Sequence, residues 1–214
     1  MMKNNNLLNR NKKTLVLISI LILLPSVFGI LMWNSLPDSL PVHWDFSGNP
    51  DGYAGRPFAV IGFPLILLLL FWVCVLGISK DPKAHNVNSR VFRILLWIFP
   101  VISLIFSAFI YSYSMGIKVN VTMITLILLG LMFIVIGNYL PKCKPTYTIG
   151  IRVPWTLADP ENWTKTHRLG GKLFIAAGFI SIVSIFLGTD IPAIISLIAA
   201  GVIPVIYSFV IYKK

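Results

Sequence analysis

The feature that most limits how this chain can fold is a set of six long runs without Asp, Glu, Lys, Arg or His. Each run has 17 residues or more, which is enough for a helix to cross the hydrocarbon core of a bilayer. The runs do not alternate apolar and polar residues, as the strands of a membrane β-barrel would. We therefore predict an all-α, polytopic membrane protein with six transmembrane helices. The predicted spans are Thr14–Trp33, Pro57–Ser79, Ile94–Ile117, Val119–Leu140, Leu173–Thr189 and Ile191–Tyr212.

Composition and charge agree with this prediction and set the topology. Of the 214 residues, 57% are hydrophobic and 12% are charged, whereas soluble domains are about 25% charged. The net charge of +11 would indicate a nucleic-acid partner in a soluble protein, but 16 of the 18 Lys and Arg residues fall on one side of the predicted spans. Basic loops stay in the cytoplasm, so we expect both termini to be cytoplasmic. The same distribution removes the reason to expect direct nucleic acid binding.

The segment 34–56 lies outside the cell in this topology and is too long to be a simple turn. The sequence Asn49-Pro50-Asp51-Gly52 is typical of a turn, because proline presets φ and glycine permits a positive φ. Apolar and polar residues alternate before it, as in a strand with one apolar face. The alternating residues are Val42, His43, Trp44, Asp45 and Phe46. We predict a small hairpin on the outer membrane surface.

His43 and Asp45 would face the same side of that strand, which leaves three interpretations open. A metal ion would need three or four ligands, and only Asp38 and Asp51 could be added on this side, so we expect no metal site. A local hydrogen bond between histidine and aspartate would instead fix the loop. The third interpretation is direct contact with an external ligand. The residues for such a contact are His43, Trp44, Asp45 and Asp51.

The second long connection, 141–172, would be cytoplasmic and contains six of the basic residues. Asp159 followed by Pro160 predicts a helix start, since Asp accepts free amide hydrogens and Pro suits the first helical position. The pair Gly170-Gly171 suggests that this helix ends before the fifth span. We therefore expect a short helix over about 160–169 at the cytoplasmic surface.

Two interpretations of this cytoplasmic loop remain open. Trp155 and Trp163 are typical of the lipid headgroup region, and basic residues suit anionic lipid, so the loop would anchor the protein at the interface. Alternatively, the loop would dock a cytoplasmic partner. A catalytic role for Glu161 and His167 is not expected, because no nucleophile motif accompanies them.

The chemistry that the predicted spans lack excludes several classes of membrane protein. Proton-coupled pumps and intramembrane proteases place ionisable residues within the bundle, and none of the six runs contains one of the types named above. No Walker A motif is present, so the chain is not an ATPase by itself. We expect no enzyme activity, no catalytic residues and no cofactor. A small-molecule or lipid transporter remains the alternative function.

Two segments of the sequence resemble a known family. The inner segment Gly150-Ile151-Arg152-Val153-Pro154-Trp155-Thr156-Leu157, followed by Trp163 and Thr166-His167-Arg168, resembles the hallmark of the SdpI family. The outer segment Pro41-Val42-His43-Trp44 with Gly48-Asn49-Pro50-Asp51-Gly52 resembles the DUF1648 module that precedes it in many members.

The resemblance covers nearly the whole chain, which we interpret as one integral membrane domain, 1–214. Its DUF1648-like part would be 1–80, with the outer loop 34–56. Its SdpI-like part would be 81–214, with the cytoplasmic loop 141–172.

The resemblance also implies a function and a place in the cell. It implies an immunity protein of the bacterial cell membrane that protects its producer from a secreted, membrane-active peptide toxin. It further implies a receptor that holds a cytoplasmic transcriptional repressor at the membrane. The expected partners are therefore the lipid bilayer, a peptide toxin outside and a repressor inside. For the inner partner we expect contacts from Arg152, Pro154, Trp155, Trp163 and Arg168.

Overall fold

A computed structural model describes residues 5–45 and 47–212 of the chain, and it divides into two compact units. The first unit consists of 1–80 and 92–121, and the second of 81–91 and 122–214. The helices are α1 (Asn5–Leu31), α2 (Phe63–Ser79), α3 (Ser89–Ser114), α4 (Val121–Tyr139), α5 (Pro154–Ala158), α6 (Pro160–Ser184) and α7 (Ile191–Tyr212). The strands are β1 (Ser39–Trp44) and β2 (Pro50–Gly55).

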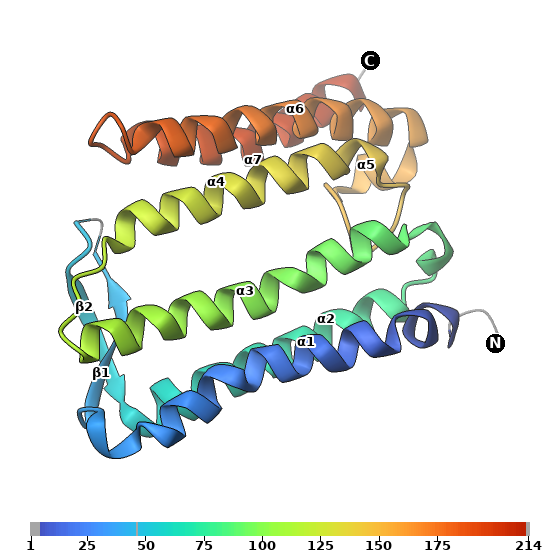
Figure 1. Cartoon of the computed structure of the whole chain (residues 1–214). Coiled ribbons are helices and arrows are strands. Elements are labelled where there is room, and N and C mark those ends of the chain that lie inside the picture. Colours follow the sequence, from blue (N-terminus) through green and yellow to red (C-terminus); the bar gives the residue numbers. More distant parts are fainter. Residues whose placement is uncertain (1–4, 46, 213–214) are drawn as a thin grey trace. The chain divides into compact units, whose positions relative to one another are not determined.

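In the first unit, α1 and α3 are joined by polar side chains that contact helix carbonyls. The Ser103 hydroxyl donates to the carbonyl of Ile22 at 2.8 Å, and the Tyr111 hydroxyl donates to the carbonyl of Pro25 at 2.8 Å. Both contacts advance along the two helices in the same direction, so α1 and α3 run parallel (Figure 1). Such bonds stabilise helix pairs in lipid, where the apolar faces alone give little preference for a partner helix.

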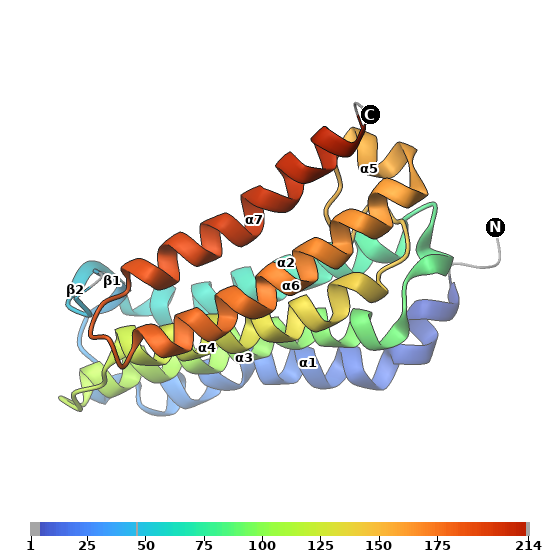
Figure 2. The same cartoon turned by 90° about the horizontal axis from the view of Figure 1, so that it is seen from above.

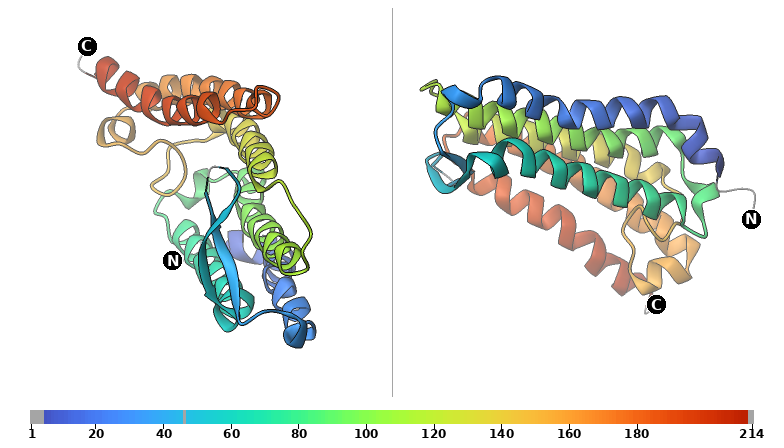
Figure 3. Two further views of the ribbon diagram at one scale, coloured as in Figure 1. Left: turned by 90° about the vertical axis from the view of Figure 1, so that its left-hand side faces the viewer. Right: turned by 90° about the horizontal axis from the view of Figure 1, so that it is seen from below.

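The predicted hairpin is confirmed as an antiparallel pair of strands at one end of this unit (Figure 3, left), while its place outside the cell stays a prediction. Its apolar side packs on a buried cluster drawn from the hairpin, the start of the second apolar run and α3. The cluster consists of Leu36, Leu40, Ala59, Val60 and Ile110. Val42 and Trp44 pack against it while His43 stays exposed, so the predicted alternation is correct over these residues. Phe46 lies outside the described residues.

In the second unit, α4 and α6 approach closely through two pairs of glycines. A Cβ added to Gly130 would lie 2.7 Å from the carbonyl oxygen of Gly178, and one added to Gly137 would lie 2.7 Å from that of Gly171. Only glycine allows backbones this close, which is a common way to join helices in membranes. On its other side α6 packs along α7, and α5 lies at the end where α7 finishes (Figure 2).

The prediction that a short surface helix ends at Gly170-Gly171 is wrong. The helix α6 begins at Pro160, as expected, but continues without a break to Ser184. Neither glycine has the positive φ of a helix end. Both are buried and let α6 approach Leu140 and Pro141, so they serve packing rather than termination.

Five helices in the described part of the chain are long and apolar enough to cross a membrane. They are Leu7–Leu31, Phe58–Ser79, Ser89–Ser114, Val121–Lys142 and Ile191–Tyr212. The remaining predicted span, Leu173–Thr189, corresponds to the second half of α6 and the turn that follows it. The chain is thus a mainly helical, multi-pass membrane protein, while the sixth span and the orientation of the termini stay predictions.

The glycine contacts between α4 and α6 predict an asymmetry between two glycine-to-alanine variants. Gly178→Ala would place a methyl group 2.5 Å from the carbonyl oxygen of Gly130, so we expect the second unit to lose about 1–3 kcal/mol of stability. Gly201→Ala on α7 is the matched control, because nothing lies within 4 Å of its added Cβ. Thermal unfolding in detergent would measure both. Equal unfolding temperatures would contradict the close approach of α4 and α6.

Candidate functional site

Arg56 fastens the base of the hairpin. Its guanidinium donates to the carbonyls of Trp33 at 2.7 Å and Pro37 at 3.2 Å, and also pairs with the carboxylate of Asp38. The same group lies 5.3 Å from the centre of the Trp33 ring. Planar guanidinium groups suit such combined stacking and hydrogen bonding. Arg56 thereby closes the loop between α1 and β1.

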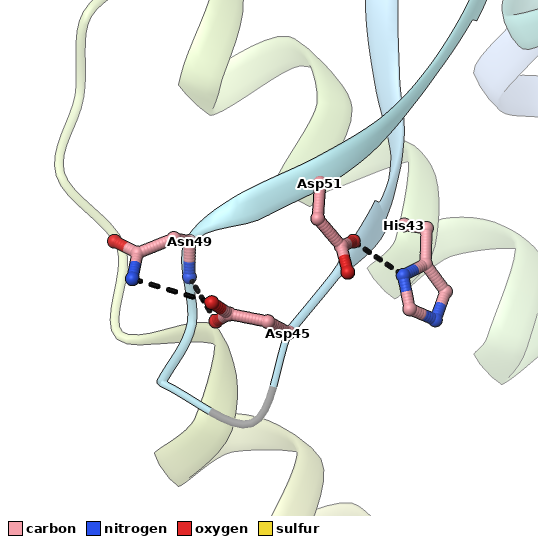
Figure 4. Close-up of polar contacts among 4 residues, drawn as sticks. All are labelled: His43, Asp45, Asn49 and Asp51. Atoms are coloured by element: carbon pink, nitrogen blue, oxygen red, sulfur yellow. Dashed lines mark hydrogen bonds and ion pairs between the residues drawn. The ribbon is translucent and has the colours of Figure 1, made fainter.

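The hairpin turn is closed between Asp45 and Asn49, and Pro50 already begins β2, so the prediction of a turn at Asn49–Gly52 is wrong. Asp45 organises it, since its carboxylate accepts from the backbone amide of Asn49 at 2.8 Å and its own amide donates to the Asn49 carbonyl at 2.8 Å (Figure 4). Gly48 supplies the positive φ, at 82°. Gly52 instead lies in β2 opposite His43, where an added Cβ would be 2.8 Å from that of the histidine.

A histidine–aspartate contact does exist in the hairpin, but its partner differs from the pair considered first. The His43 ring pairs with Asp51 across the two strands, whereas Asp45 bonds to Asn49 (Figure 4). The His43 side chain is 71% exposed and that of Asp51 48%, so this pair contributes little to folding. The described residues contain no group of three or more His, Cys, Asp and Glu side chains placed to hold a metal.

On the second unit, His167 holds the loop that carries the inner motif. Its Nε2 accepts from the backbone amide of Ile151 at 3.0 Å, and its Nδ1 lies 2.8 Å from the carbonyl of Trp163, to which it donates. This pattern requires the neutral imidazole with its proton on Nδ1. The ring also stacks on Trp163, with centroids 4.0 Å apart. Burial lowers the pKa of His167 to about 4.

Gly150 explains why the motif contains glycine next to this ring. Its φ is +114°, which side-chain-bearing residues rarely adopt. A Cβ at this position would also run into His167 Nε2 and lie 2.9 Å from the Trp163 ring. Trp163 is 1% exposed and donates from Nε1 to the Cys143 carbonyl at 2.8 Å. The loop backbone therefore lies directly on α6.

The short helix α5 is bound to α7 by its tryptophan. Trp155 donates from Nε1 to the Ser208 hydroxyl at 2.6 Å and packs on Phe209, with ring centroids 5.1 Å apart. Asn162 on α6 reaches the same turn of α7, donating to the Ser208 carbonyl at 2.8 Å. Thr156 accepts from the Val153 amide at 3.1 Å and so braces the start of α5.

The predicted inner contact residues therefore separate into two groups. Arg152, Pro154 and Arg168 are exposed, and the Arg152 guanidinium donates to the carbonyl of Tyr147 at 2.6 Å. Trp163 is buried and Trp155 is half-buried, so both hold the loop from beneath. A partner would meet the exposed group directly, part of Trp155 as well, and Trp163 only through the backbone that it positions.

Several residues that shape these surfaces carried no clear signal in the sequence. Arg56 counted only as one of two basic residues on the outer side, and His167 belonged to the family-like motif without an expected partner. Asp81, a buried carboxylate, was not singled out at all, although an acidic residue within a basic connection is an exception. Spacing alone could not reveal their distant partners, which lie 16 to 67 positions away along the chain.

Comparison with known proteins finds a family match over each of the two segments. Residues 142–211 match the SdpI/YfhL protein family, and residues 20–68 match a domain of unknown function, DUF1648. The chain carries an SdpI-family domain. Over 211 residues it is 28% identical to the immunity protein SdpI of Bacillus subtilis (strain 168), covering 95% of this chain and 97% of the relative. No solved structure matches the chain. The chain is thus a multi-pass bacterial membrane protein.

The buried histidine of the SdpI-family domain predicts a pH-dependent stability. Because its pKa is lowered from the ordinary 6.5 to about 4, the unfolded chain binds more protons between these values. The contribution of His167 to the free energy of unfolding is therefore fully present above about pH 6.5 and falls as the pH drops towards 4, by at most about 1.4 kcal/mol per pH unit.

Thermal unfolding of the purified protein between pH 7.5 and 4.5 would measure this slope. His167→Gln serves as the comparison, because glutamine does not titrate. Its slope should be shallower than that of the wild type, whatever its absolute stability. Parallel slopes for the two proteins would refute the neutral, buried state of His167.

The contacts of Arg56 predict that the hairpin opens more readily when they are removed. Arg56→Gln removes the guanidinium that contacts Trp33, Pro37 and Asp38, so we expect local opening favoured by about 1–3 kcal/mol. The measurement is the rate at which an added protease cleaves between 34 and 56. Lys118→Gln is the control, since it removes an exposed basic residue. Equal cleavage of both variants would show that Arg56 does not fasten the hairpin.

Proposed function

We propose that this protein is an immunity protein that protects its cell from a secreted, membrane-active peptide toxin. The observation that carries the proposal is similarity to an immunity protein over nearly the full length of both chains. The similarity includes both the hairpin and the inner loop, because the two family matches fall on these segments separately. We propose a role in binding rather than in catalysis.

We propose that the hairpin is the part that meets the toxin. His43 and Asp51 present exposed polar side chains on the two strands, and the half-buried Asp45 holds the turn beside them, while the apolar side is buried. The scaffold beneath them is fixed by Arg56 and by the Trp44 ring, which lies edge-on to Phe106 at 5.7 Å. Fixed side chains on a rigid strand pair favour binding, because little conformational entropy is lost when a partner arrives.

We propose that the inner loop is the part that would hold a cytoplasmic repressor. Arg152 and Arg168 are exposed there, and exposed arginines are suited to carboxylate groups on a partner. Neither is in any of the three ion pairs formed by the described residues. Among those residues, Lys165 is paired instead with Glu161 at 2.7 Å.

The test is survival of a sensitive bacterium that expresses the protein and is challenged with the secreted killing peptide of the family's namesake. Cells with the wild-type protein should survive and retain their membrane potential, whereas empty-vector cells should not. The hairpin variant Asp45→Asn/Asp51→Asn should be about tenfold more sensitive, the effect of losing about 1.4 kcal/mol of binding. Asp190→Asn, which removes a third acid predicted on the outer side, should protect like the wild type.

A parallel variant separates the two surfaces. Arg152→Gln removes the exposed guanidinium of the inner loop, and Lys144→Gln is its matched control on the same loop. If the loop serves only repressor binding, Arg152→Gln will protect fully but fail to retain a repressor in membrane fractions. Wild-type protein that inserts and gives no protection against this peptide would overturn the proposed immunity to it.

A further inference from the structure

The connection between α2 and α3 belongs to the second unit rather than to the helices that it joins. Residues 81–91 group with the loop and helices of the SdpI-family part, although Lys80 before them and Phe92 after them belong to the first unit. The chain therefore leaves the hairpin-bearing unit at residue 80, contributes to the motif-bearing unit, and returns at residue 92. Contacts within the second unit explain this arrangement.

The central contact is made by Asp81, a carboxylate that is 2% exposed. Its Oδ1 accepts from the backbone amide of Lys83 at 2.7 Å, which is a local turn. Its Oδ2 accepts from the amide of Tyr147 at 2.9 Å and from the hydroxyl of Thr148 at 2.7 Å. One oxygen thus serves the connection and the other serves the motif loop.

Further contacts in the same place strengthen the junction. Asn86 donates to the Pro145 carbonyl at 2.8 Å, and the Lys83 ammonium lies 4.9 Å from the centre of the Tyr147 ring. The carbonyl of Tyr147 in turn accepts from Arg152. Tyr147 therefore contacts both residues: its amide donates to Asp81 and its carbonyl accepts from the exposed Arg152.

Burying a carboxylate between two loops costs desolvation free energy, because a charge is stabilised in the protein interior only when its acceptor sites are filled. None of the three ion pairs among the described residues supplies a cation to Asp81. An apolar contact could hold the segments together but would not fix one register, whereas three directed hydrogen bonds do. The hydrogen bonds of Asp81 therefore fix the register of the two loops and do not merely hold them together.

We infer that Asp81 is a positioning residue that makes the α2–α3 connection and the motif loop a single body and so sets where Arg152 stands. Displacement of the ends of α2 and α3 then moves the exposed surface of the loop. The functional arm of this inference rests on the proposed immunity function, but the structural arm does not. The junction would be a route by which displacement of α2 and α3 reaches the inner motif.

We call the contacts of Asp81 with Tyr147 and Thr148 the clamp. The variant Asp81→Asn separates the clamp from the local turn at Lys83. The amide oxygen of asparagine can still accept from Lys83, but its NH2 group then replaces the oxygen that faces two donors. We expect hydrogen exchange at the Tyr147 amide to quicken about tenfold, the effect of losing one buried hydrogen bond. Exchange at the Ile151 amide should not change, because His167 holds it independently.

Two other variants keep the test decisive. Thr148→Val removes one donor to Asp81 and should change exchange in the same direction but less, even if Asp81→Asn were to misfold. Asp190→Asn changes an acid in the turn between α6 and α7 and should leave exchange at Tyr147 as in the wild type. Unchanged exchange in both Asp81→Asn and Thr148→Val would overturn the clamp.

Protection and repressor retention form the second readout. If Asp81 positions the loop, Asp81→Asn will lose whichever of these properties Arg152→Gln loses, with the arginine still present. Quickened exchange together with full wild-type behaviour would overturn the positioning role and leave only a structural contact. If even the wild type gives no protection and retains no repressor, the proposed function fails, and the exchange data alone uphold or overturn the clamp.

Discussion

Backbone amides and carbonyls have no water to bind within a bilayer, so each must be satisfied by the protein itself. This constraint makes the apolar runs helical, and it also determines how the helices recognise each other. Hydroxyls on one helix reach carbonyls on the next, as Ser103 does at Ile22 and Ser181 does at Leu126, 3.0 Å away. Close glycine crossings also join α4 and α6 in the second unit.

In the irregular segments outside the predicted spans, side chains satisfy backbone groups that secondary structure leaves free. Asp45 satisfies the hairpin turn, His167 the Ile151 amide, and Asp81 the amides of Lys83 and Tyr147. Each of these polar groups contacts at least one backbone group and so fixes the path of the chain. The exposed residues that we assign to partners stand on segments fixed in this way, which is the arrangement expected of binding loops on a rigid scaffold.

Sequence reasoning predicted the elements whose signal is periodic or local. The apolar runs became helices, the alternation of Val42, His43 and Trp44 became a strand, and Asp159 caps α6 by accepting from the Glu161 amide at 2.8 Å. Sequence reasoning failed where a residue can play two structural roles and only its neighbours in space decide between them. Gly170 and Gly171 could end a helix or allow one to pack closely, and Gly52 could turn a chain or sit against a facing Cβ. Composition cannot distinguish these, because the deciding neighbour is distant in sequence.

The continuity of α6 has a consequence for how the inner surface works. Its first turns carry Trp163 and His167, which hold the motif loop, and its later turns carry Gly171 and Gly178, which cross α4. A helix interrupted at Gly170 would have let the surface segment move separately from the packed segment. Since the helix is unbroken, the motif loop moves with the packed part of α6, while Asp81 ties the loop to a connection that the chain shares with α2 and α3. The exposed Arg152 therefore lies between two fastenings, and a change at either one alters its position without any change in the residues beside it.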